Sequence, residues 1–111
     1  MSAKPPTEED FKRHVGTKFS VRINGPQPVE LELDEVKGYS AGAREPGGME
    51  RFSLYFHGPG DAMLPQGSFV MEHPSMGELL LFMVPIGRDE RGFRYEVVFN
   101  YYREGDETAN S

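Results

Sequence analysis

Apolar residues alternate with polar residues along most of the chain, which is the pattern of β-strands with one buried face. The alternation recurs in five segments, at 18–23, 29–34, 51–57, 67–73 and 93–102. Turns rich in glycine and proline separate these segments, as at Asn24-Gly25-Pro26. Val36 falls out of phase with Leu33, which predicts a bulge or a bend at residues 34–35.

The segment 79–84 departs from this pattern, because all six of its residues are apolar. Gly77 precedes the segment, and Pro85 and Gly87 follow it. A strand without polar positions is expected where both of its faces are hidden from water. The segment is therefore expected either to run through the middle of a small β-fold or to pack its second face against another chain.

A short helix is predicted near the N-terminus. The sequence Thr7-Glu8-Glu9-Asp10 has the form of a capping box, with Thr7 as the N-cap and Asp10 reaching back to it. Phe11 and Val15 would share one apolar face of a helix of about two turns, and Gly16 is placed to end it. Because so short a helix is unstable alone, we expect Phe11 and Val15 to anchor it on the sheet.

The number and spacing of these elements predict the fold class. One short helix precedes six strands whose connections are mostly too short for crossover helices, which favours sequential antiparallel pairing. We predict a mainly β protein, in which a six-stranded antiparallel, bent sheet closes into a small barrel, or forms a tight sandwich, with the helix packed against it. Residues 7–103 are predicted to form one domain, 1–6 and 104–111 flexible tails, and 38–48 a long surface loop.

Composition and charge narrow the classes of function. The chain of 111 residues has 18 acidic and 12 basic residues and a net charge of −6, which argues against nucleic acid and membrane surfaces as partners. It has no cysteine, which excludes disulfides and thiolate metal sites and fits a cytoplasmic location. The first residues lack the apolar run of a signal peptide, and the longest apolar run is too short to span a membrane.

The residue types that carry catalysis or metal binding are not predicted to come together. A metal site would need His57, His73 and Glu72, but the two histidines fall at opposite ends of a predicted hairpin, roughly 20 Å apart at ~3.3 Å per residue. Ser53 and His57 would lie on one strand about 13 Å apart, too far for a nucleophile and its base. We therefore predict no catalytic residue, no metal and no cofactor.

Two further features of the strands are open to a functional or a structural interpretation. Glu96 lies in a strand rich in aromatic residues, and if both faces of that strand are partly covered it is expected to pair with Arg51 or Arg94. Four tyrosines could form a stacking platform for bases or sugars, although aromatic residues at this spacing are more often core or interface residues. The tyrosines are Tyr55, Tyr95, Tyr101 and Tyr102.

Two hypotheses of function follow, and we favour the first. The domain is a non-catalytic module for protein–protein interaction or assembly, and its partner is itself, as a homo-oligomer. The interface candidates are Leu80, Phe82, Val84, Tyr101 and Tyr102. In the alternative, the domain is a small-ligand-binding β-barrel, although a barrel of this size is normally filled by its own side chains. The pocket would be lined by Phe52, Phe56, Phe69, Phe82 and Phe99.

Several motifs together resemble a small uncharacterised bacterial family of β-rich domains, a domain of unknown function. The clearest are Phe11-x-x-His14-Val15-Gly16, the run 51–59, Leu64-Pro65-Gln66-Gly67 and Leu81-Phe82-x-Val84-Pro85-x-Gly87. The resemblance covers roughly residues 11–100 and implies a compact β-rich domain, with no activity and no catalytic residues attached. The order of helix and bent sheet is also similar to an Sm-like barrel, which makes nucleic-acid binding a distant alternative. The sequence lacks the RNA-binding motifs of that family.

Overall fold

The computed structural model describes residues 6–25, 27–38 and 49–102. In chain order its elements are α1 (Glu8–Lys12), β1 (Lys18–Val21), β2 (Val29–Gly38), β3 (Met49–Gly58), β4 (Gly67–His73), β5 (Gly77–Asp89) and β6 (Gly92–Tyr102). The predicted tails and the predicted loop over 38–48 fall almost entirely outside the described residues.

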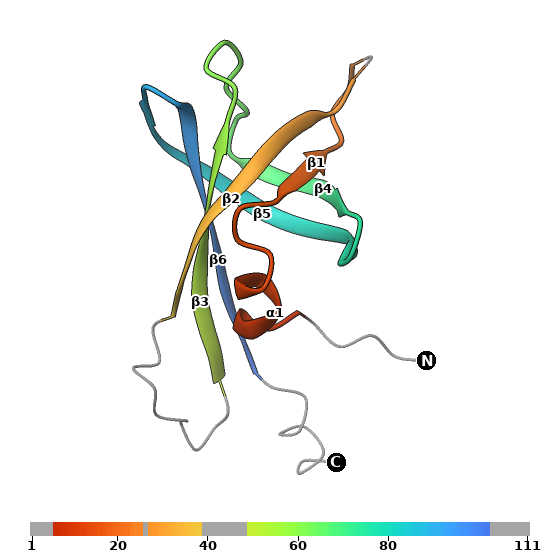
Figure 1. Cartoon of the computed structure of the whole chain (residues 1–111), viewed down its shortest axis with the longest axis vertical. Coiled ribbons are helices and arrows are strands. Elements are labelled where there is room, and N and C mark those ends of the chain that lie inside the picture. Colours follow the sequence, from red (N-terminus) through yellow and green to blue (C-terminus); the bar gives the residue numbers. More distant parts are fainter. Residues whose placement is uncertain (1–5, 26, 39–48, 103–111) are drawn as a thin grey trace.

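The six strands pair antiparallel and close in a ring in the order β1-β2-β3-β6-β5-β4 (Figure 1). This confirms the predicted mainly β fold with one short N-terminal helix. The ring is not an even barrel, since β1 and β4 pair at only two positions, whereas β3 and β6 pair from Met49–Tyr102 to Gly58–Phe93. The pairing is also not fully sequential, because β3 lies beside β2 and β6 and never beside β4. The expectation that β3 and β4 pair as a hairpin is therefore wrong.

The alternating segments place their apolar side chains inside the ring, as the period-two pattern requires. The register of β2 against β3 shifts between Leu33 and Glu35, which confirms the predicted bulge. The buried core consists of Phe11, Phe19, Val21, Leu31, Leu33, Phe52, Leu54, Phe56, Leu64, Met71, Leu81, Met83, Tyr95 and Val97. This set fills the interior of the ring with the chain's own side chains.

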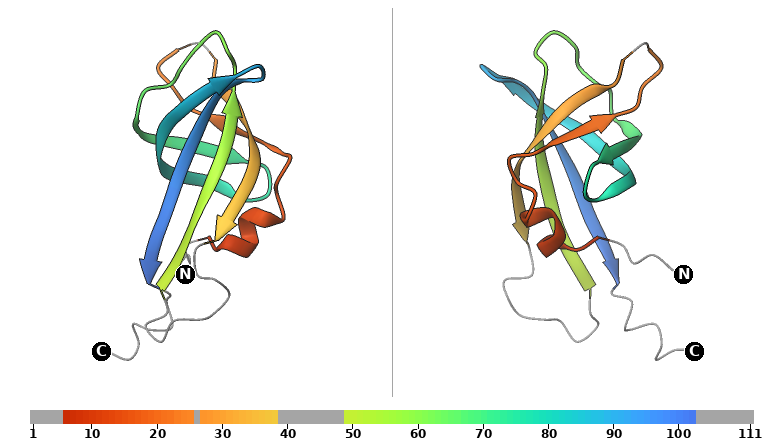
Figure 2. Two further views of the ribbon diagram at one scale, coloured as in Figure 1. Left: turned by 90° about the vertical axis from the view of Figure 1, so that its left-hand side faces the viewer. Right: turned by 45° about the vertical axis from the view of Figure 1, so that its right-hand side comes forward.

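Helix α1 lies beside the lower parts of β2 and β3 in Figure 1, and Figure 2 shows the same arrangement from two other sides. The capping box is present, since the Thr7 amide donates to Asp10 Oδ2 at 2.9 Å and the Asp10 amide donates to Thr7 Oγ1 at 3.2 Å. Phe11 is fully buried, and its ring packs against three further phenylalanines. Val15 is 43% exposed, so the prediction that it anchors the helix is wrong. The helix ends at Lys12, before Val15 can share its apolar face.

Candidate functional site

The outer face of β5 exposes large apolar side chains. Leu80 is 70% exposed and Phe82 50% exposed, whereas Leu81 and Met83 on the inner face are 6% and 0% exposed. Of the two expected arrangements of 79–84, a strand covered on both faces by its own chain is therefore wrong, and a second face packed against another chain stays a prediction. The sheet is one layer thick, so the inner positions are covered by the core while the outer ones face solvent.

Neighbouring strands extend this apolar surface. Val70 of β4 lies directly opposite Leu80. On the other side, Met83 pairs with Val97, so the next residue of β6, Val98, points outward as Phe82 does. Val98 is 60% exposed. We call the set Val70, Leu80, Phe82, Val84 and Val98 the outer patch.

The predicted interface candidates and the residues of the outer patch overlap only in part. Val84, an interface candidate, is half-buried and belongs to the patch. The other two candidates, Tyr101 and Tyr102, lie on β6, but their side chains fall outside the described part of the structure. Val98 was missed, because its place beside Phe82 depends on β5 and β6 being paired in this register.

Ion pairs hold the charges at one border of the outer patch. Arg22 Nη2 lies 2.8 Å from Glu78 Oε2 and also contacts Glu72 Oε2. Hydrogen bonding to Glu72, and then to Glu78, raises the pKa of Arg22 above its ordinary value. The acidic side chains next to the patch on this side are thus already paired with a cation.

At the opposite border, Glu96 is held by hydroxyl groups. Ser53 Oγ donates to Glu96 Oε2 at 2.8 Å, and the Tyr55 hydroxyl donates to the same oxygen at 3.2 Å. Glu96 was predicted to pair with Arg51 or Arg94, but its partners in the structure are these two hydroxyl groups. Arg94 lies instead over the ring of Tyr55, at 5.8 Å. Because Ser53 is turned toward Glu96, it is not placed to work with His57.

The interior offers little support for the ligand-binding alternative. Phe52 and Phe56 are fully buried in the core, and Phe52 stacks on Phe99 at 4.6 Å. Phe82, expected to line a pocket, points out of the ring. Tyr95, expected in a stacking platform, is fully buried, and its hydroxyl accepts a hydrogen bond from the Leu64 amide at 2.9 Å.

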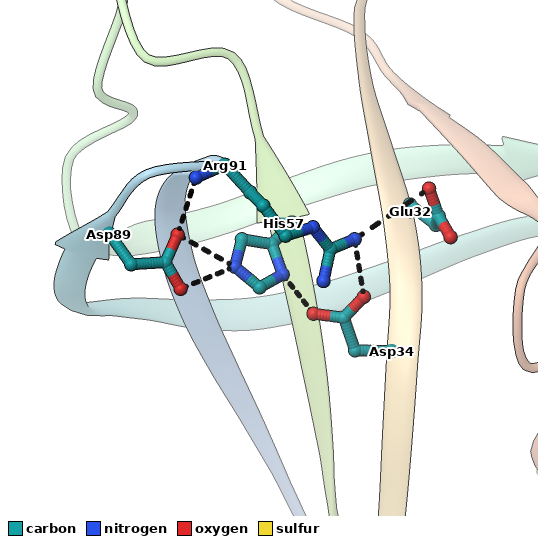
Figure 3. Close-up of polar contacts among 5 residues, drawn as sticks. All are labelled: Glu32, Asp34, His57, Asp89 and Arg91. Atoms are coloured by element: carbon teal, nitrogen blue, oxygen red, sulfur yellow. Dashed lines mark hydrogen bonds and ion pairs between the residues drawn. The ribbon is translucent and has the colours of Figure 1, made fainter.

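A second cluster surrounds His57 at the end of β3 (Figure 3). Its Nδ1 contacts Asp34 Oδ2, and its Nε2 lies 3.0 Å from Asp89 Oδ2. The hydrogen bond with His57, the largest cause, lowers the pKa of Asp89, and so does the Arg91 amide, which donates to its Oδ1 at 2.9 Å. Arg91 also reaches Asp34 Oδ1 at 3.3 Å. The cluster joins the β2 bulge, the end of β3 and the β5–β6 hairpin.

A third cluster surrounds His73 at the end of β4. Its Nδ1 accepts from the amides of Ser75 and Met76 at 3.0 and 3.3 Å, so its Nε2 carries the proton and donates to Thr17 Oγ1 at 2.9 Å. Burial, followed by the nearby charge of His14, lowers the pKa of His73. His57 and His73 thus have separate partners, and no group of three potential metal ligands occurs among the described residues.

These features define a small β domain whose six strands close in an uneven ring, with a short helix beside it and an apolar outer patch. The chain belongs to the family DUF6916, a domain of unknown function, whose model matches residues 6–99. This confirms the resemblance to an uncharacterised domain family. No curated protein and no solved structure matches the chain. In the described part of the chain, no helix is long and apolar enough to cross a membrane.

Proposed function

We propose that this domain is a non-catalytic assembly module that associates with a second copy of itself through the outer patch. The observation that carries the proposal is the exposure of Leu80, Phe82 and Val98 side by side on neighbouring strands. Contiguous exposed apolar groups rimmed by polar residues are typical of interaction surfaces. A twofold dimer would bring the same patch of two copies together, so that each shields apolar side chains of the other from water.

The charges at the patch allow a second copy as the partner, although the charge of the whole chain opposes association. A net charge of −6 makes two copies repel each other at long range. The patch itself carries no charge, and the acids at its Arg22 border are ion-paired. Two copies can therefore bring their patches together without opposing unpaired carboxylates at that border.

The test compares two neighbouring leucines of β5 that face opposite ways. Leu80→Lys should abolish association and leave the fold intact, because residue 80 is exposed in the single chain. Leu81→Lys should unfold the domain, because burying an unpaired charge costs several kcal/mol, about 3 or more. Light scattering across concentration measures the mass, and circular dichroism measures the fold.

Asn24→Lys is a matched control, since it adds the same charge at an exposed turn position that is not part of the patch. It should associate as the wild type does. A wild-type mass of 12.5 kDa at high micromolar concentration would overturn the proposal, and so would a Leu80→Lys variant that still associates.

A further inference from the structure

The two edges of β5 are paired over different lengths. On one edge, β4 pairs with β5 from His73–Gly77 to Gly67–Met83. On the other edge, pairing with β6 begins only at Met83–Val97 and continues to Asp89–Gly92. Among the described residues, the first half of β5, Gly77 to Phe82, therefore has a strand on one side only.

The open edge results from the uneven closure of the ring. Beyond Val97, β6 continues alongside β3 as far as Tyr102. The first half of β5 instead follows β4, and the two pairs of strands diverge in Figure 1 and in the right-hand view of Figure 2. The backbone groups of β5 that face this opening have no strand partner within the described ring.

Of the features that usually protect an open strand, this edge has one charged residue, Glu78, and near it Asp10 and Arg13 of the α1 segment, which line a hollow with Glu78 and Leu79. Edge strands are commonly blunted by lysine, by proline or by a bulge. Residues 77–82 contain neither lysine nor proline, and the register shift of β5 comes later, between Pro85 and Gly87. The single charged residue in this segment is Glu78, which is already paired with Arg22.

We infer that the first half of β5 pairs antiparallel with the same segment of a second copy, so that the two sheets join across a twofold axis. The inference rests on the proposed self-association and specifies its geometry. With the axis at Leu80, this residue meets its own copy, and Glu78 lies opposite Phe82 of the second copy. Each acid thus faces an apolar side chain, and like charges are not opposed.

This register also brings the outer apolar side chains of the two copies into contact with one another. Leu80 and Phe82 of the two copies would form one continuous outer strip, flanked by Val70 of β4, which lies opposite Leu80. The inner residues Leu79 and Leu81 would stay with the core of their own copy. Backbone hydrogen bonds across the new edge supply affinity, and the side chains fix the register.

Cysteine cross-linking distinguishes edge pairing from face-to-face packing, and the chain has no cysteine of its own. Leu80→Cys should form a disulfide-linked dimer, because residues that face each other across paired strands lie within the Cα separation of about 4.4–6.8 Å that a disulfide requires. Phe82→Cys should not, since its two copies would be about 13 Å apart along the strands. Packing of one sheet face on another would hold either pair about 10 Å apart and link neither.

Non-reducing gel electrophoresis after mild oxidation measures the fraction of disulfide-linked dimer, and light scattering gives the wild-type mass in parallel. Efficient cross-linking of Leu80→Cys with little for Phe82→Cys supports the inference. A wild-type dimer in which Leu80→Cys does not cross-link overturns edge pairing and leaves the proposed function standing. A wild-type monomer overturns both. Hydrogen exchange gives a second measurement, since the amides of 77–82 that face the open edge, and not those paired with β4, should exchange about tenfold more slowly in the wild type than in Leu80→Lys.

Discussion

His57 and His73 occupy similar positions and have opposite surroundings. Each lies at or next to the end of a strand, and each is nearly buried, at 9% and 7% exposure. The ring of His57 lies between two carboxylates, from Asp34 and Asp89. The ring of His73 instead accepts backbone amides at Nδ1 and meets a hydroxyl at Nε2.

The difference shows that two similarly buried histidines can make opposite kinds of hydrogen bond, depending on the groups that surround them. The ring of His57 meets a carboxylate oxygen at each nitrogen, so both of its neighbours are hydrogen-bond acceptors. A ring whose Nδ1 accepts amides is satisfied only as the neutral form, and burial lowers the pKa of His73 accordingly. One ring therefore lies among carboxylate acceptors, and the other lies among backbone amide donors.

The largest effect is expected on removing His57. His57→Ala removes a nearly buried ring and its hydrogen bonds with Asp34 and Asp89, so we expect a loss of about 2 to 3 kcal/mol in the free energy of unfolding. Urea denaturation at neutral pH measures it. Lys18→Ala, at an exposed position of β1, should cost less than about 0.5 kcal/mol. An equally small loss for His57→Ala would show that the cluster contributes nothing to stability.

This cluster also shows where prediction from sequence stops. The bulge at Asp34 was predicted from the phase of Leu33 and Val36, and His57 was placed at the end of its strand. Their contact depends on the strand order, in which β3 lies between β2 and β6. Sequential pairing of β3 with β4 was expected instead, so the β5–β6 hairpin and its Asp89 were never placed near His57. Local periodicity identifies strands, but it does not determine which distant strands become neighbours.

The hairpin reaches His57 through a glycine that the periodicity does not explain. Gly92 has φ 131°, a region that favours glycine, and a Cβ at this position would overlap the carbonyl oxygen of Gly58. Asp89 and Arg91 are thereby brought against the end of β3. The sequence shows Gly92 only as a turn residue, and the close approach becomes visible with the tertiary structure.

For β5 the limit of prediction is of another kind. The apolar run 79–84 was identified correctly as two-sided, but a run of this kind cannot show whether its second face is covered by the same chain. In the described structure Leu80 and Phe82 are exposed, so the single chain does not cover the second face. What covers them in an assembly is the subject of the cross-linking experiment.

A smaller loss in the free energy of unfolding is expected on removing His73, and the stability at this site should depend on pH. His73→Ala removes the acceptor of the Ser75 and Met76 amides, which should cost about 1 to 2 kcal/mol at pH 7.5 by urea denaturation. In the wild type the pKa of His73 is lowered in the folded state from 6.5. As the pH falls below about 6.5, the unfolded chain therefore binds a proton that the folded chain does not, and stability decreases.

His73→Asn separates the stability that comes from accepting the two amides from the pH dependence that comes from titration of the ring. A short amide side chain can accept from backbone amides two or three positions on, and it does not titrate. The variant should retain part of the stability at pH 7.5 and lose stability less steeply than the wild type between pH 6.5 and 5. Identical slopes for the two proteins would show that His73 is not the group that responds to acid.

The smallest effect is expected at Asp89, whose side chain is 44% exposed. Its pKa is lowered from 3.8 chiefly by the hydrogen bond with His57, so its contribution is present above about pH 3.8 and is lost as the pH falls through the folded pKa. Asp89→Asn should therefore leave the slope between pH 6.5 and 5 unchanged and weaken the loss below pH 3.8. Because the Asp89 carboxylate is partly exposed to solvent, 0.5 M salt should reduce the difference between variant and wild type at neutral pH. Acid titrations of stability at two salt concentrations test both points, and a variant that loses as much stability as the wild type below pH 3.8 would contradict the role assigned to Asp89.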